Sequence, residues 1–151
     1  MTEVYYQSTK TYTHAIGLSC CFRQWRATSH CNLLHGYAIE VKLTFEAEQL
    51  DHRNWVQDFG GLKDIKSWLE GTFDHAVIVA EDDPKKEIFH MLHAQHLMRV
   101  VVLPHVGCEA FAKTIFDYVE EHIRLSSTYA VLKEVEVREH AGNSAKCIRR
   151  D

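Results

Sequence analysis

The sequence predicts an α+β domain in which an antiparallel sheet carries helices on one face. Apolar and polar residues alternate near the start of the chain and again near its end, as in strands with one buried face. Apolar residues between these segments recur at helical spacing instead. The chain has 151 residues, the usual size of one domain, and we expect a single domain over residues 1–151.

Two strands are expected at each end of the chain. Residues 3–16, rich in Tyr and Thr, favour a first strand, and residues 37–48 alternate as a second one. The last two strands are expected at residues 129–137 and 144–148. Residues 17–30 are interpreted as a long loop between the first two strands, and loops of this length commonly carry function.

Three helices and two short apolar segments are expected in the middle of the chain. The helices are predicted at residues 61–72, from 84 to about 95, and at 108–123, because apolar residues recur there at helical spacing. Four residues of the second helix are expected to face inward: Ile88, Phe89, Met91 and Leu92. Residues 76–80 form an apolar run, and residues 98–103 are predicted to be a strand.

The bulk properties argue against several classes of protein. A formal net charge of −4 gives no indication of binding to nucleic acid or to a membrane surface. No window approaches the ~18 uninterrupted apolar residues of a membrane span. The first residues also lack the basic and apolar regions of a signal peptide. We therefore expect a cytoplasmic protein with no nucleic-acid or membrane partner.

Cysteine and histidine supply the first candidate site. The odd count of five cysteines, without a secretion signal, argues against a disulfide framework. Cys31 and His35 stand where the second strand begins, so Cys31 is a candidate nucleophile or general base, or else a small buried residue. His35 and Tyr37, two residues apart on a strand, share one face and form a candidate metal-binding pair, although a phenol is an uncommon zinc ligand.

Four acidic or imidazole side chains near the ends of elements are further candidates. Asp74 and His75 are adjacent and offer a general acid–base with a carboxylate beside it, or else a turn and a surface histidine. Glu139 near the end of a strand suits a pair of N–H donors on a pterin or guanine ring, or it is solvated. Glu109 lies near a helix start, where a negative charge is favourable in any case.

These motifs occur in an order that resembles one enzyme family. The segments are Cys31 to Gly36, Trp55 to Lys63, Asp74-His75, Glu109, and Val135 to Glu139. Together they resemble the 6-pyruvoyl-tetrahydropterin synthase / 6-carboxy-tetrahydropterin synthase family over nearly the whole chain. Each motif alone is weak, and the combination is specific.

The resemblance implies a fold, an assembly and an activity. The fold is the tunnelling fold, a four-stranded antiparallel sheet with two helices, whose subunits join into a barrel as a trimer or hexamer with active sites between subunits. The activity is a lyase reaction on 7,8-dihydroneopterin triphosphate, in tetrahydropterin or 7-deazapurine (queuosine-type) biosynthesis. Alternatives are a divergent relative that acts on another pterin with altered or no metal, and a non-catalytic oligomer that binds pterin or purine.

The resemblance also implies roles for individual residues. Cys31 would be the thiolate that abstracts a proton, His75 the acid–base partner, and Asp74 the group that orients His75. Glu139 would bind the amino-pyrimidine edge of the pterin. Glu109 occupies the position of the family's helix-start glutamate and is expected to contact substrate.

A zinc ion held by three histidines is the implied cofactor, one from the first strand and two from a His-Gly-His motif. Here Tyr37 replaces the last histidine. Either His14 is the first-strand ligand, or Phe22 has replaced it. We prefer His14, because it ends a strand-like run, and we expect a site of His14, His35 and Tyr37. His30, Cys20 or Cys21 could supply the third ligand instead of Tyr37.

Overall fold

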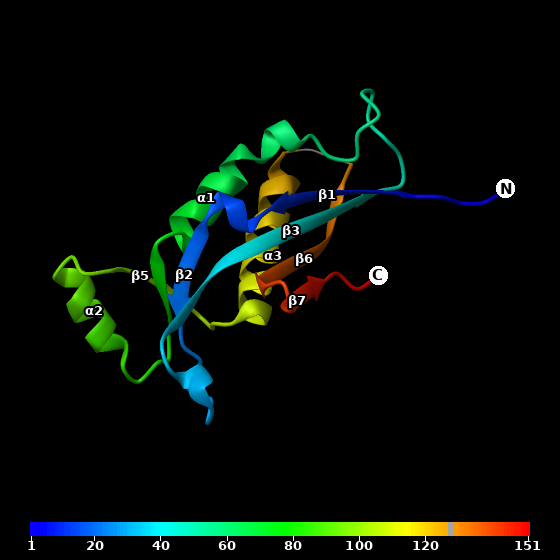
Figure 1. Cartoon of the computed structure of the whole chain (residues 1–151). Helices are drawn as coiled ribbons and strands as arrows, with labels where there is room; N and C mark the ends of the chain where they lie inside the picture. Colours follow the sequence, from blue (N-terminus) through cyan, green and yellow to red (C-terminus); the bar gives the residue numbers. More distant parts are fainter. Residues whose placement is uncertain (127–128) are drawn as a thin grey trace.

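The structure is a computed structural model of the chain that describes residues 1–126 and 129–151. Its strands form one sheet in the order β5-β4-β2-β3-β6-β7, and β1 also pairs with β3. The strands are β1 (Tyr6–Tyr12), β2 (Leu18–Phe22), β3 (His35–Ala47), β4 (Ala76–Ala80), β5 (Arg99–Leu103), β6 (Val131–His140) and β7 (Asn143–Ile148). Helices α1 (Lys63–Phe73) and α3 (Cys108–Leu125) lie over one face of the sheet, whereas α2 (Lys86–Ala94) lies apart from them, near β5 (Figure 1).

Strand β3 is the centre of the sheet, and β1 and β2 pair in sequence along the same edge of it. Tyr12 of β1 lies opposite Val41, and Leu18 of β2 lies opposite Ile39, so the two strands continue one another in register. The short 3-10 turn His14–Ile16 interrupts them, and Gly17, at φ 78°, brings the chain back to the edge of β3. The predicted first strand is therefore confirmed at Tyr6–Tyr12 but ends earlier than expected, and the prediction of a loop over 17–30 was wrong at Leu18–Phe22.

The predicted antiparallel sheet is present, and two parallel strands extend it. Strands β1 and β2, β3, β6 and β7 form the antiparallel part. Strand β4 pairs parallel to β2, and β5 pairs parallel to β4. Every residue of β4 is buried, which explains its continuous apolar run. The sequence indicated the two segments but not their place in the sheet.

The core lies between the sheet and the helices α1 and α3. Ile65 and Leu69 of α1 and Ile115 of α3 are fully buried in this core, where α1 contacts β2 and β4 and α3 contacts β6 and β7. The rings of Trp68 and Tyr118 stack at 4.0 Å and join the two helices. The predicted helices at 61–72 and 108–123 are thus confirmed within two residues at each end.

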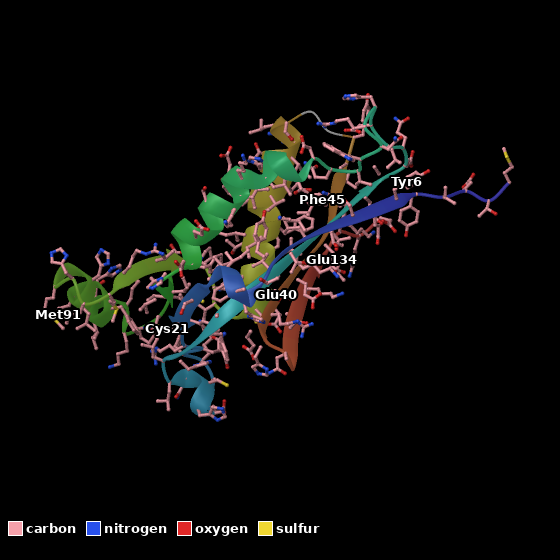
Figure 2. All side chains as sticks on the ribbon, turned by 45° about the horizontal axis from the view of Figure 1, so that its top comes forward. Tyr6, Cys21, Glu40, Phe45, Met91 and Glu134 are labelled. Atoms are coloured by element: carbon pink, nitrogen blue, oxygen red, sulfur yellow. The ribbon has the colours of Figure 1, made fainter. Side chains whose placement is uncertain are left out.

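Helix α2 forms, but it does not bury the face that was predicted. Ile88 is 49% exposed and Met91 is 53% exposed, and no residue of α2 is fully buried. Met91 lies at the opposite end of the molecule from Tyr6 (Figure 2). The reason is that α2 packs beside the edge strand β5 and its neighbour β4, away from the core between the sheet and helices α1 and α3. None of the helices in the described part of the chain is long and apolar enough to cross a membrane.

Candidate active site

A cavity of about 490 Å³ opens where β2 ends, β3 and α3 begin, and β6 turns into β7. It brings together four of the predicted site residues, Cys31, His35, Glu109 and Glu139, from distant parts of the chain. Its lining comprises Phe22, Gln24, Cys31, His35, Gly107, Cys108, Glu109, Glu139, Gly142, Asn143, Ser144 and Ala145. One sheet edge and one helix start therefore supply a mixed acidic, thiol and imidazole site of a size typical for small ligands.

Two neighbours hold the carboxylate of Glu139 in the cavity. The amide of Asn143 donates to Oε1 at 3.0 Å, and the thiol of Cys108 lies 3.9 Å from Oε2. Burial, together with the nearby charges of Glu139 and Glu109, raises the pKa of Cys108 to about 12, so the thiol stays protonated and donates. The Glu139 side chain is only 20% exposed, and its orientation is therefore set before any ligand arrives.

Cys31 and Glu109 face this cavity from a loop and a helix start that Gln24 joins. The amide of Gln24 donates to the carbonyl of Cys31 at 2.9 Å, and its side chain donates to the carbonyl of Val106 at 3.3 Å. Gly107 precedes α3 at φ 109°, a conformation that favours glycine. Cys31 is partly buried in the 3-10 turn His30–Asn32.

Sequence reasoning missed Gln24, Cys108 and Asn143 as residues of this site. Cys108 was placed only at the start of the predicted helix 108–123, and Asn143 falls between the strands predicted at 129–137 and 144–148. No spacing rule connects these residues, because β6, β7 and α3 meet only after the sheet has formed. The one available signal was that Cys108 adjoins Glu109 and Asn143 lies near Glu139 in the sequence; nothing in the sequence connects Gln24 with them.

Aromatic and imidazole rings gather beside the cavity at the corner where a metal ion was expected, and two of them, Phe22 and His35, line it. Phe22 lies opposite His35 in the β2–β3 register, with the ring centres 5.3 Å apart. The ring of Tyr37 lies 5.5 Å from His35 and 5.9 Å from His140. Partial burial raises the pKa of the Tyr37 phenol, and the neighbouring groups Glu139, Cys31 and Cys108 raise it further.

The preferred metal site of His14, His35 and Tyr37 is not assembled. His14 contacts the carbonyl of Ala38, and its Nε2 lies 3.9 Å from Glu40. Side chains alternate along β3, so Glu40 is on the face opposite His35 and Tyr37, which pack toward the core side with Ile39. His14 was misplaced because β2, not residues 3–16, supplies the strand that pairs with His35.

The remaining candidate ligands do not complete the set either. His30 is exposed, Cys20 is buried in the core at 4% exposure, and Phe22 has no lone pair to offer a metal. In residues 1–126 and 129–151, no group of three or more His, Cys, Asp and Glu side chains is arranged to hold a metal ion. The residues present therefore do not fit a zinc ion held by three histidines.

Asp74 and His75 form an ordered pair at the start of β4. His75 Nδ1 lies 2.9 Å from Asp74 Oδ1, which also accepts from the amide of Ser19 at 3.2 Å. His75 has φ 54°, a strained conformation for a residue with a side chain, and its own amide donates to the carbonyl of Ser19. Partial burial opposes ionisation of Asp74, but the bonds from His75 and Ser19 outweigh it and lower its pKa.

This pair does not share a cavity with Cys31 and Glu139. The His75 side chain is 85% exposed, and it lines a separate hollow of about 400 Å³ with Cys21, Gly36 and Tyr37. Gly36 is required there because a Cβ would lie 2.7 Å from the carbonyl oxygen of Cys20. A single chain thus presents the predicted binding residues in one place and the predicted acid–base pair in another.

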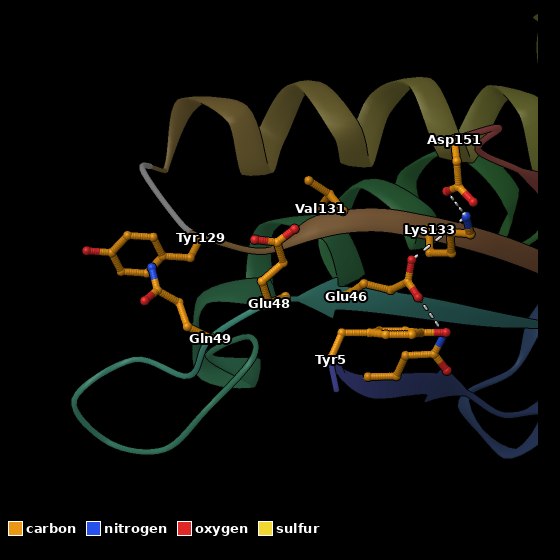
Figure 3. A pocket seen from close by; sticks show the side chains of 10 residues that line it. Tyr5, Glu46, Glu48, Gln49, Tyr129, Val131, Lys133 and Asp151 are labelled. Atoms are coloured by element: carbon orange, nitrogen blue, oxygen red, sulfur yellow. Dashed lines mark hydrogen bonds and ion pairs between the residues drawn. The ribbon is translucent and has the colours of Figure 1, made fainter. Parts of the chain in front are cut away.

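A larger cavity, of about 580 Å³, lies at the other end of the sheet near both chain ends (Figure 3). Three of its charged groups are paired with one another: Lys133 lies 2.5 Å from Asp151 and 3.9 Å from Glu46. None of the predicted site residues lines it. We therefore place the candidate site in the smaller cavity.

Comparisons with known proteins agree with this fold and identify the family. The topology is that of the tunnelling fold: the structure matches 6-pyruvoyltetrahydropterin synthase from Plasmodium vivax with a TM-score of 0.64 at 19% identity, covering 97% of this chain and 99% of the other. It matches an uncharacterized protein from Wolinella succinogenes with a TM-score of 0.84 at 19% identity, covering 97% and 99%. The sequence matches the 6-pyruvoyl tetrahydropterin synthase family over residues 11–150, and the chain belongs to that family.

A curated relative with a named activity aligns over part of the chain. The 6-carboxy-5,6,7,8-tetrahydropterin synthase of Rickettsia felis is 37% identical over 54 residues. That alignment covers 35% of this chain and 39% of the Rickettsia felis protein. The family is thus shown by the match over residues 11–150, whereas this alignment spans well under half of either protein.

Proposed function

We propose that this chain is a carbon–oxygen lyase that acts on the side chain of a reduced pterin of the 7,8-dihydroneopterin triphosphate class. The observation that supports this best is the cavity that joins Cys31, Glu109 and Glu139. A carboxylate for the ring and a thiol for the side chain are what such a reaction needs. Family membership supports the same substrate class.

Glu139 is proposed to bind the amino-pyrimidine edge of the pterin. That edge presents two adjacent N–H groups, which a carboxylate accepts with both oxygens. Asn143 and Cys108 already hold the carboxylate in place, so little conformational entropy is lost when the ring binds. Glu109, at the same cavity, is proposed to contact the polar part of the substrate.

Cys31 is proposed to take a proton from a side-chain carbon, after which triphosphate leaves with the electrons of its C–O bond. Cys31 is partly buried in the cavity lining, within reach of a ligand bound at Glu139. His75, oriented by Asp74, is proposed to complete proton transfer from a second subunit, because its exposed ring lines a separate hollow and not this cavity. This assigns the homo-oligomer, a trimer or hexamer, a role in assembling the site.

No step of this proposal passes through a metal ion. Zinc was the expected cofactor, and the corner built by Phe22, His35 and Tyr37 offers it one imidazole. A pterin-binding oligomer without catalysis is the competing function, and the same corner motivates it.

Turnover of 7,8-dihydroneopterin triphosphate tests the proposal. We expect inorganic triphosphate to be released, and Cys31→Ala to slow release about 10²–10⁴-fold while pterin binding persists. Cys147→Ala is the matched control, since Cys147 lies on β7 outside the cavity lining. Chromatography of the product separates a 6-carboxy from a 6-pyruvoyl compound. Binding without triphosphate release would establish the non-catalytic alternative.

A further inference from the structure

The corner beside Cys31 contains an aromatic ring where a metal site would need a ligand, and the pairing of β2 with β3 places that ring there. Phe22 stands directly opposite His35 in the β2–β3 pairing. Its ring is 4% exposed and packs edge-on against Phe111 at 5.1 Å, so it belongs to the core. A phenyl ring cannot coordinate a metal ion, and no rotation of Phe22 changes that.

Tyr37 occupies the next position on the same face of β3. Its ring lies edge-on to His35 at 5.5 Å, and His140, at the end of β6, lies 5.9 Å away on the other side. The phenol is also near enough to Glu139 and Cys31 for their charges to act on it. Tyr37 itself lines the neighbouring hollow, and His35, whose ring it contacts, lines the cavity that holds Cys31 and Glu139, so the phenol lies where the two adjoin.

No other histidine of the β2–β3 corner can substitute for the missing ligands. His14 is held on the opposite face of β3 by Ala38 and Glu40. His140 shares its ring nitrogens with Asn143 and the amide of Gly142. Across the parts of the chain that the structure describes, no trio of ligating side chains converges here.

We propose that this site works without a bound metal ion, and that the Tyr37 hydroxyl donates a hydrogen bond to the side-chain oxygen of the substrate in its place. The inference rests on the proposed lyase function. The base removes a C–H proton, the C–H electrons form the new double bond, and triphosphate leaves with the C–O electron pair. Tyr37 keeps its proton and only stabilises charge that develops on the oxygen.

Metal content is the first test, and it does not depend on activity. Wild-type protein incubated with zinc and freed of excess is expected to retain well under about one zinc per chain by elemental analysis. Turnover is expected to be unchanged by a chelator. About one tightly held zinc per chain that His35→Ala removes would overturn the proposal.

A designed gain of metal binding is the second test. Phe22→His combined with Tyr37→His places three imidazoles, with His35, on one corner, and we expect about one zinc per chain to be bound. Phe22→Leu with Tyr37→Phe is the control for packing and is expected to bind none. Near-UV circular dichroism reports whether both variants fold. A folded double-histidine variant that binds no zinc would show that Tyr37 does not stand in a metal position.

Removal of one oxygen atom tests the role of Tyr37. Tyr37→Phe keeps the ring contacts, so we expect kcat to fall about 10²–10³-fold while the pterin Kd changes little. An unchanged kcat would overturn the role of Tyr37, since a purely structural residue would behave in this way. If wild-type protein binds pterin but never releases triphosphate, the lyase function fails, and the metal measurements still decide whether the corner is metal-free.

Discussion

The cavity at the start of α3 and the Asp74–His75 pair at the start of β4 are built by different means. In the cavity, Glu139 is mostly buried and is held by side chains from α3 and β7. The Asp74–His75 pair is held by the backbone of Ser19 and a strained φ at His75, and its imidazole points outward. The groups that hold Glu139 all come from one chain, whereas the imidazole of His75 is exposed at the surface of that chain.

This difference indicates how the proposed chemistry is divided. Binding groups gain from burial, because a low local dielectric strengthens their hydrogen bonds. An acid–base group that serves a neighbouring subunit has to stay exposed until the subunits meet. The strain at His75 is consistent with a side chain that is fixed in direction for such a purpose.

The largest expected effect is on triphosphate release, when Cys31 and His75 are removed from different chains. Cys31→Ala and His75→Ala are each expected to lower triphosphate release about 10²–10⁴-fold. Co-expressed and purified as mixed oligomers, they are expected to recover about a quarter of the sites, because each site would take Cys31 and His75 from different subunits. Mixed oligomers with no recovery above the single variants would place both residues of each site on one chain.

A smaller effect is expected within the cavity. Glu139→Gln keeps the shape but removes the charge, and should weaken pterin binding by about 1.5–3 kcal/mol, the value of a hydrogen bond to a charged group. Fluorescence titration with a pterin measures the Kd. Glu120→Gln, on the exposed side of α3, is the matched control. An affinity equal to that of the wild type would remove Glu139 from the binding site.

The smallest effect concerns the pH dependence of stability at the Asp74–His75 pair. The pKa of Asp74 is lowered in the folded chain, so its bonds stabilise the fold above its ordinary pKa and are lost as pH falls through the folded value. Relative to Asp74→Asn, wild-type protein should be more stable at neutral pH, by less than about 1 kcal/mol because the side chain is partly exposed. Thermal unfolding from neutral to acidic pH should show the two curves converge, and a constant difference would contradict this.

The elements of the fold were largely readable, because their patterns are local. The strands at 37–48, 129–137 and 144–148 and the helices at 61–72 and 108–123 correspond to β3, β6, β7, α1 and α3. Strand β2 was missed, although Leu18, Cys20 and Phe22 alternate as buried residues, because residues 17–30 were interpreted as one long connection after the first strand. The prediction that one face of α2 is buried was wrong, because nothing in the sequence indicates which helix lies near the edge of the sheet.

The residues of the site could be predicted from the sequence, but not which of them lie together. The motif order selected Cys31, Glu109 and Glu139, and the structure gathers them in one cavity. It also selected Asp74 and His75, which the structure pairs but places in another hollow. The predicted metal ligand His14 was wrong, because the strand that pairs with His35 is determined by contacts between residues far apart in the sequence.

The sequence by itself determined the alternating and helical segments, the family, and the acid, thiol and imidazole groups available for chemistry, since these depend on residue identity and spacing. Only the tertiary structure decided that Phe22 faces His35, that Cys108 and Asn143 hold Glu139, and that His75 and Cys31 line different hollows. Pairing between β2 and β3 sets all side chains of β2 on one face or the other. That register is fixed by burial of the sheet against α1 and α3. It places aromatic rings beside His35, where a zinc site was expected.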